Sequence, residues 1–198
     1  MISRLSELML RYLLKCDVIN DSDDEKEYYQ YGIEITISSL LNVFLIMGIG
    51  IIFRSMFESV VFLVLFMLIR QFTGGFHANT YFKCNCSFCI SFITVLFMYY
   101  TTYEKMTICF SVLISGLCVA VIILACPIEH INKPIPKHKR KFYKVVAAIL
   151  GVIYGIIGTI LIALSNKYGV LIIYTLVLVS VLIIAAILKD RRCKYAEE

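Results

Sequence analysis

Residues that could do chemistry gather in one short segment, 70–84, between two long apolar runs. The segment reads RQFTGGFHANTYFKC. Its candidate residues are a guanidinium, two glycines, an imidazole and a thiol, namely Arg70, Gly74, Gly75, His77 and Cys84. A cysteine attacks as a thiolate, and a nearby histidine takes or balances its proton. Glycines leave backbone N–H groups free to approach a developing oxyanion. The segment therefore has the parts needed for nucleophilic catalysis.

The spacing of the histidine and the cysteine sets a geometric condition. On a straight helix, residues seven apart share a face but lie about 10.5 Å apart along the axis. That separation is too long for a hydrogen bond between the two side chains. If His77 and Cys84 form a dyad, the helix must break between them, and the glycine pair with Asn79 and Thr80 suits an irregular segment. We expect Cys84 to begin the third apolar span and His77 to lie on the connection that leads into it.

The same residues have two other interpretations. A lone cysteine beside an apolar helix usually packs, and a histidine beside two glycines is usually a satisfied loop residue. Alternatively, Cys84, Cys86 and Cys89 with His77 would make a Cys₃His zinc site. The C-x-C-x₂-C spacing is not a common zinc-finger pattern, and on a helix Cys86 and Cys89 share a face from which Cys84 points away. We expect no metal or other cofactor, but composition and spacing alone leave catalysis and packing open.

The elements that must position this segment are long apolar runs. Of the 198 residues, 60% are hydrophobic and 17% are charged, whereas soluble domains are nearer half and a quarter. Most runs approach the roughly 20 residues that a bilayer core requires, so the sequence predicts an all-α integral membrane protein. The six predicted spans are residues 33–53, 56–72, 87–103, 106–126, 142–164 and 168–188. Several of the eight cysteines, among them Cys109, Cys118 and Cys126, lie inside apolar runs, so no secreted disulfide framework is expected.

The first residues, MISRLSELMLRYLLKC, interleave charged and apolar side chains at helical spacing. A cleavable signal peptide needs an uninterrupted apolar centre. We therefore predict that residues 1–16 form an amphipathic helix in the membrane interface; the alternative is a short helix packed on the rest of the protein. After it, Ser22-x-x-Glu25 has the form of a capping box, which predicts a helix start leading into the first span.

The basic residues predict the orientation of the spans. With the N-terminus inside, sixteen Lys and Arg residues fall on the inner side and three on the outer side. The outer three are Arg54, Lys105 and Lys167. This asymmetry follows the positive-inside rule. It predicts that both termini and the 70–84 segment lie on the cytoplasmic side of a cell membrane.

A third catalytic partner is less clearly marked. Glu34 lies at the cytoplasmic end of the first span, and an acid there needs a partner, so it is a candidate to orient His77 or to pair with Arg70. Gln71 and Asn79 are alternatives. Arg70 ends an apolar run, which favours a role in the site; its other interpretation is an anchor that reaches lipid phosphate.

The pattern Arg70-x₃-Gly74-Gly75-x-His77-Ala78, followed by Cys84 in a six-span chain of about 200 residues, resembles the accessory gene regulator protein B family (AgrB). The resemblance covers essentially the whole chain. It includes the amphipathic N-terminus and the basic loop that begins Pro127-Ile128-Glu129.

The resemblance implies a membrane-embedded cysteine endopeptidase of quorum sensing, with residues 1–198 forming one peptidase domain. Its substrate would be a short AgrD-like precursor peptide with an amphipathic leader, a central signal segment and an acidic tail. His77 and Cys84 would be the catalytic pair, and Arg70 and Gly75 match other positions on which activity depends. The enzyme would cleave off the acidic tail through an acyl-enzyme thioester and promote thiolactone ring formation.

The resemblance also implies partners. They are the precursor peptide, the lipid bilayer and a second copy in a homodimer, and no nucleic acid. The basic run 137–141 could gather an acidic tail, although basic cytoplasmic loops also exist simply to set topology. His130 and His138 lie in that loop and are expected to be solvated.

A small six-span transporter or channel, with a Cys/His metal site at 77–89, is the main alternative from another function class. A transporter would be expected to carry polar groups near the membrane midplane and an internal repeat. The charges inside the spans, Glu34, Glu58 and Lys144, all lie near span ends, and no repeat is visible. These features favour the enzyme.

Overall fold

The computed structural model describes residues 2–16, 22–74, 81–128 and 137–195. In these ranges the chain is all-helical, as predicted, with seven α-helices and no strand. The helices are α1 (Ile2–Lys15), α2 (Asp23–Ile52), α3 (Met56–Thr73), α4 (Tyr81–Thr102), α5 (Ile108–Ala125), α6 (Lys137–Ala163) and α7 (Tyr168–Tyr195).

Helices α2 to α7 are each long and apolar enough to cross a membrane, which confirms the six predicted spans. The second span, the shortest in the sequence, is an unbroken helix of 18 residues, roughly 27 Å at 1.5 Å per residue. The third prediction began too late, because α4 starts at Tyr81 and not at residue 87. The polar and cysteine-rich stretch 81–86 hid the helix start, since apolar periodicity is weak there.

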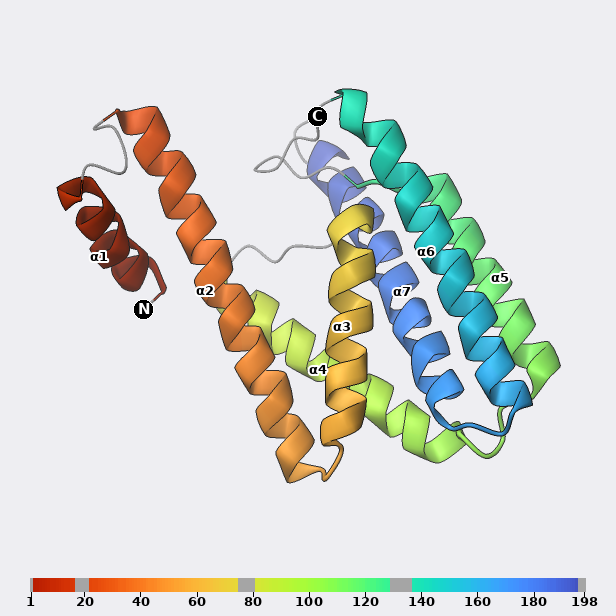
Figure 1. Cartoon of the computed structure of the whole chain (residues 1–198). Helices are drawn as coiled ribbons and strands as arrows, with labels where there is room; N and C mark the ends of the chain where they lie inside the picture. Colours follow the sequence, from red (N-terminus) through yellow and green to blue (C-terminus); the bar gives the residue numbers. More distant parts are fainter. Residues whose placement is uncertain (1, 17–21, 75–80, 129–136, 196–198) are drawn as a thin grey trace.

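The helices form two groups (Figure 1). Helices α3, α5, α6 and α7 run nearly side by side, and α6 and α7 each contact the other three. Helix α4 runs obliquely from α2 to α7, and α2 contacts both α3 and α4. Helix α1 packs mainly on α2. The space bounded by α2, α3 and α4 therefore lies beside the main bundle.

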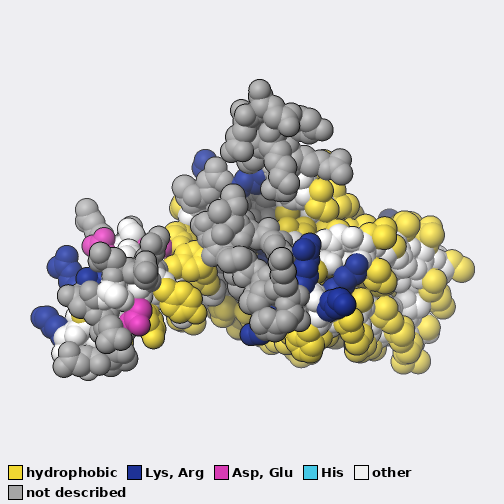
Figure 2. All heavy atoms as spheres, turned by 90° about the horizontal axis from the view of Figure 1, so that it is seen from above, with side chains coloured by type: hydrophobic (Ala, Val, Ile, Leu, Met, Phe, Trp, Pro, Cys, Tyr) yellow, Lys and Arg dark blue, Asp and Glu magenta, His cyan; other side chains and the backbone are white. Residues whose placement is uncertain are grey.

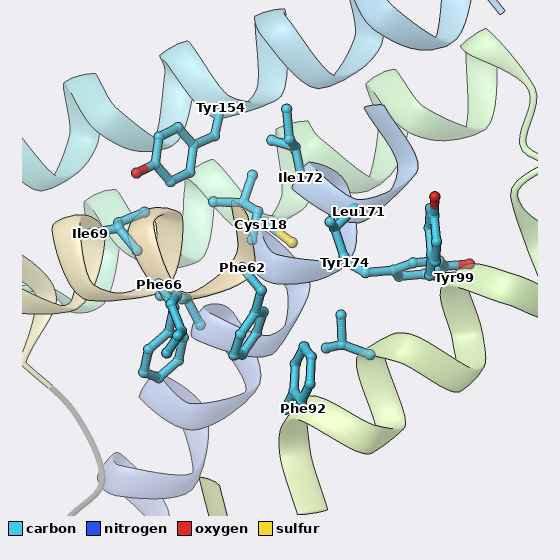
Figure 3. Packing of buried hydrophobic residues seen from close by; sticks show 14 of the residues in the cluster. Phe62, Phe66, Ile69, Phe92, Tyr99, Cys118, Tyr154, Leu171, Ile172 and Tyr174 are labelled. Carbon is cyan, nitrogen blue, oxygen red and sulfur yellow. The ribbon is translucent and has the colours of Figure 1, made fainter. Parts of the chain in front are cut away.

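The core is built around α7 and an aromatic cluster (Figure 3). Leu171, Ile173 and Leu176 of α7 are fully buried. Figure 3 shows Phe62 of α3 facing Phe92 of α4, with ring centroids 4.8 Å apart. Lipid tails are as apolar as these side chains, so close packing and not hydrophobic transfer is the main gain between such helices.

Helix α1 buries only a narrow stripe of its described side chains against the rest of the protein. Ser6 and Leu10 are buried, whereas Leu8 and Tyr12 are exposed. The predicted helix is thus present and packed on α2, while its position in a membrane interface stays a prediction. Helix α2 begins after Ser22 as expected, but the Ser22 side chain makes no capping hydrogen bond.

An ion pair between a buried carboxylate and a half-exposed lysine joins helix ends at the end of α3 opposite Arg70. The Glu58 side chain is 7% exposed, and its Oε1 lies 3.3 Å from Lys167 Nζ. The same oxygen accepts a hydrogen bond from the Tyr99 hydroxyl at 3.4 Å. This contact ties the start of α3 to α4 and to the turn before α7.

Viewed from the other end of the bundle, the described surface carries Lys and Arg side chains with hydrophobic side chains along the flanks (Figure 2). This end includes the start of α6, where Lys139, Arg140 and Lys141 are exposed. The distribution agrees with a multi-pass membrane protein. Which membrane side this end faces stays a prediction from the basic residues.

Candidate active site

Cys84 lies in the first turn of α4, where the sequence placed it. It lines a cavity of about 220 Å³ between α2, α3 and α4, closed at one point by α7. The lining residues are Ile35, Ser38, Ser39, Asn42, Val43, Leu63, Phe66, Met67, Arg70, Tyr81, Cys84, Ser87, Phe88, Ser91 and Leu182. The thiol is therefore in the wall of a partly open cavity and not only in packing contact with its neighbours.

Arg70, in the last turn of α3, lines the same cavity. Its guanidinium carbon lies 5.5 Å from the centroid of the Phe66 ring, one turn earlier on the same helix. It interacts electrostatically with Cys84. A guanidinium and the positive N-terminal end of a helix thus lie in the same cavity wall as the thiol.

Two phenylalanines hold these helices at the level of the site. Phe66 precedes Arg70 by one turn and Phe88 follows Cys84 by one turn, and their ring centroids are 4.9 Å apart. Phe62 continues the stack one turn farther along α3, 5.5 Å from Phe66 and 5.9 Å from Phe88. Because aromatic pairs have preferred geometries, this stack limits how far Arg70 and Cys84 can move apart.

Glu34 is engaged by other partners than those considered from the sequence. One carboxyl oxygen accepts a hydrogen bond from Ser6 of α1 at 3.1 Å, and the other accepts one from the Tyr81 hydroxyl at 2.9 Å. Tyr81 is the first residue of α4, three residues before Cys84, and it also lines the cavity. Glu34 thus ties the start of α4 to α1 and α2. Sequence reasoning missed Tyr81.

Polar side chains continue along the cavity beyond Cys84. On α4, Ser87 and Ser91 follow Cys84 at spacings of three and seven, which share a helical face. On α2, Ser38 donates a hydrogen bond to the Asn85 side-chain oxygen at 2.9 Å, and Asn42 follows one turn later. Sequence reasoning missed these residues as well; their i, i+3 and i+4 spacing within apolar helices was the available signal.

Gly74 ends α3 in a conformation that requires glycine. Its φ is +68°, and an added Cβ would collide with the carbonyl oxygen of Ile128. The Ile128 N–H also donates to the Thr73 carbonyl at 3.0 Å. The end of α3, and with it Arg70, is therefore held against the chain that follows α5.

Several predicted residues fall outside the described residues. His77, Gly75 and Asn79 lie in the 75–80 gap, so the pairing of His77 with Cys84 stays a prediction; His130 lies in the 129–136 gap. Gln71 is exposed on α3 and does not line the cavity.

The other two thiols of the CNCSFC stretch, Cys86 and Cys89, are partly exposed on α4. Within residues 2–16, 22–74, 81–128 and 137–195, no group of three Cys, His, Asp or Glu side chains is arranged to hold a metal ion. A zinc site that includes His77 would involve a residue outside those ranges.

Comparison with known proteins gives a family. A family model described as "Accessory gene regulator B" matches residues 6–185. "Putative AgrB-like protein 2" of Clostridium perfringens (strain 13 / Type A) is 23% identical over 146 residues, which cover 71% of this chain and 67% of that protein. "Putative AgrB-like protein" of Clostridium perfringens (strain SM101 / Type A) is 25% identical over the same coverage. No solved structure matches the chain.

Proposed function

Because this chain belongs to the accessory gene regulator B family, we propose that it is a membrane-embedded cysteine endopeptidase that processes a short AgrD-like precursor peptide. The observation that carries the proposal is the place of Cys84: a thiol in the first turn of α4, in the wall of a cavity that it shares with Arg70. A thiol that only filled space would not need a cavity or a guanidinium beside it.

In the proposed first step, the Cys84 thiolate attacks the carbonyl carbon of the peptide bond between the signal segment and the acidic tail. Arg70 faces the oxyanion that develops there. His77, as an imidazolium, gives its proton to the departing amine, and the C–N bond breaks. The tail leaves with a free amino group, and the signal segment stays on Cys84 as a thioester.

In the second step, a cysteine thiol of the peptide attacks this thioester. It loses its proton to the His77 imidazole, a new thioester closes the ring, and Cys84 departs as a thiolate. One thioester replaces another, so the step is near-balanced, whereas hydrolysis of the acyl-enzyme runs downhill. A cavity that excludes water therefore serves the cyclisation.

The remaining parts of the proposal concern the setting of the enzyme. The excess of basic residues on one side of the spans supports cytoplasmic termini and a cytoplasmic active site in the cell membrane. The exposed basic side chains at the start of α6 could attract the acidic tail. We also propose that the chain acts as a homodimer, on the ground of family resemblance alone.

A cleavage assay in membranes tests the proposal, with an AgrD-like precursor peptide as substrate. Wild type is compared with Cys84→Ser, His77→Ala, Cys86→Ser and Cys89→Ser. We expect that only the first two abolish tail release, and that wild type accumulates a thioester between Cys84 and the peptide in mass spectrometry. Tail release by Cys84→Ser at the wild-type rate, or equal loss in all four variants with zinc in the purified protein, would overturn it.

A further inference from the structure

The cavity reaches well past the thiol. Ser91 lies seven residues after Cys84 on α4, about 10.5 Å farther along the helix axis. Between them the wall is a mixture of apolar side chains and small polar ones from α2 and α4. A site that needed only a thiol and a guanidinium would not need this extension, which therefore points to contacts with a further part of the substrate.

The side chain of Asn42 indicates what kind of group this extension binds. It lines the cavity from α2, and its side-chain oxygen is buried with no hydrogen-bond donor within reach in the described part of the chain. One turn earlier on α2, the Ser38 hydroxyl donates a hydrogen bond to the Asn85 side-chain oxygen at 2.9 Å, so a polar side chain between α2 and α4 can find a partner there. An amide oxygen left unpaired inside a membrane-spanning helix is unfavourable. A bound ligand with an N–H group would remove that penalty.

We infer that this cavity binds the signal segment, the stretch of precursor on the amino-terminal side of the cleaved bond, and that the Asn42 side chain turns its Oδ1, which is buried without a ligand, into the cavity to accept one of the backbone N–H groups of that segment. The inference rests on the proposed endopeptidase function, because it takes the cleaved carbonyl to lie at Cys84. An extended peptide in a water-poor site must find acceptors for its N–H groups. Asn42 and the serine hydroxyls of the wall supply them.

The charge and the volume of the cavity favour binding of the signal segment over binding of the acidic tail. Apart from Arg70, no residue that lines the cavity carries a charge. Burying several carboxylates there would be strongly unfavourable. The volume of about 220 Å³ is also below the roughly 300–1,000 Å³ of pockets that enclose a whole small ligand. The cavity therefore takes a few residues next to the cleaved bond, and the tail stays outside.

This placement has a chemical consequence. The signal segment is the part that stays on Cys84 after the tail leaves, so a filled cavity keeps water away from the thioester. It also holds the chain in place while the peptide's own thiol approaches. Asn42 should thus affect how the acyl-enzyme partitions between cyclic and hydrolysed product.

The first test is Asn42→Leu in the full-length protein in membranes, with the precursor peptide as substrate. Leucine keeps the approximate size and removes the acceptor. The matched control is Thr36→Val on the same helix, where the exposed hydroxyl donates to the Gly32 carbonyl of its own helix. We expect kcat/KM for tail release to fall about 2- to 12-fold in Asn42→Leu, the range for one neutral hydrogen bond. The proportion of linear to cyclic product should rise, and Thr36→Val should match wild type.

The second test fills the far end of the cavity with Ser91→Leu. We expect a higher KM for the natural precursor. A scan that shortens one precursor side chain at a time to alanine or glycine should then restore KM at a position on the amino-terminal side of the cleaved bond. If Asn42→Leu fails to reach the membrane, this scan decides alone.

Two results would overturn the inference. One is that Asn42→Leu equals Thr36→Val in both kcat/KM and product ratio; the other is that only changes in the tail restore KM in Ser91→Leu. Either result with Cys84→Ser inactive rejects the binding site and leaves the proposed function standing. An active Cys84→Ser rejects the proposed function itself.

Discussion

Removal of the Tyr81 hydroxyl tests whether the start of α4 must be held in place for Cys84 to react. The hydroxyl donates to a Glu34 carboxyl oxygen across 2.9 Å and so links the start of α4 to α2. Hydrogen bonds to charged groups contribute about 1.5–3 kcal/mol, and Tyr81 is only partly buried, so we take the lower value. At about 1.4 kcal/mol per tenfold, Tyr81→Phe should reduce kcat for tail release roughly tenfold if the bond keeps the first turn of α4 in the competent position.

A double-mutant cycle separates this effect from general damage. Glu34→Gln keeps an acceptor but removes the charge, so its loss of activity should be smaller, and Tyr81→Phe should cost less in the Glu34→Gln background than in wild type. The control is Tyr28→Phe on α2, a tyrosine that is 76% exposed. Rates are measured with purified protein in vesicles, with the melting temperature recorded for each variant. If the two substitutions are additive, or if Tyr81→Phe matches Tyr28→Phe, the positioning argument is wrong.

Two further predictions concern stability in detergent. Lys167→Met should lower the free energy of unfolding by about 1 kcal/mol, because it removes the Lys167 amine that lies 3.3 Å from the buried Glu58 carboxyl. The value is that of a surface ion pair, because the Lys167 side chain is half exposed. Partial burial lowers the pKa of Lys167, but its hydrogen bond to Glu58 and nearby negative groups raise that pKa above the ordinary 10.5 overall. The stabilisation should therefore be complete below about pH 10 and vanish as pH rises through the raised pKa, so that the melting temperatures of wild type and variant converge only in strong alkali. Gly169→Ala should destabilise by about 1–3 kcal/mol, because its Cβ would lie 2.5 Å from the Gly158 carbonyl oxygen; Gly116→Ala meets nothing within 4 Å and should melt no lower than wild type.

Much of the fold could be predicted because a bilayer imposes a strong local rule. Each span must satisfy its own backbone hydrogen bonds and present apolar side chains to lipid. Hydropathy along the chain therefore located all six spanning helices within a few residues, apart from the early start of α4. That start was missed because polar residues inside the protein, such as Asn85, weaken the apolar pattern that marks a span.

The candidate site was predictable only in part. Cys84 was expected at the beginning of the third span and is found there. Glu34 was expected to need a partner, but its partners, Ser6 and Tyr81, come from two other helices. Nothing in the sequence near Glu34 specifies which helices lie beside it, so the identity of the donors could not be read from spacing.

What the sequence determined by itself was the membrane class, the number of spans and the segment that carries the thiol, the imidazole and the guanidinium. These follow from hydropathy, residue type and spacing, which are local properties of the chain. Only the tertiary structure decided that α2, α3 and α4 line a common cavity, that Arg70 and Cys84 both lie in its wall, and that Asn42 of the same wall carries a side-chain oxygen without a partner among the described residues. These depend on the packing of Phe62, Phe66 and Phe88, which brings residues from separate helices together, and no single helix contains that information.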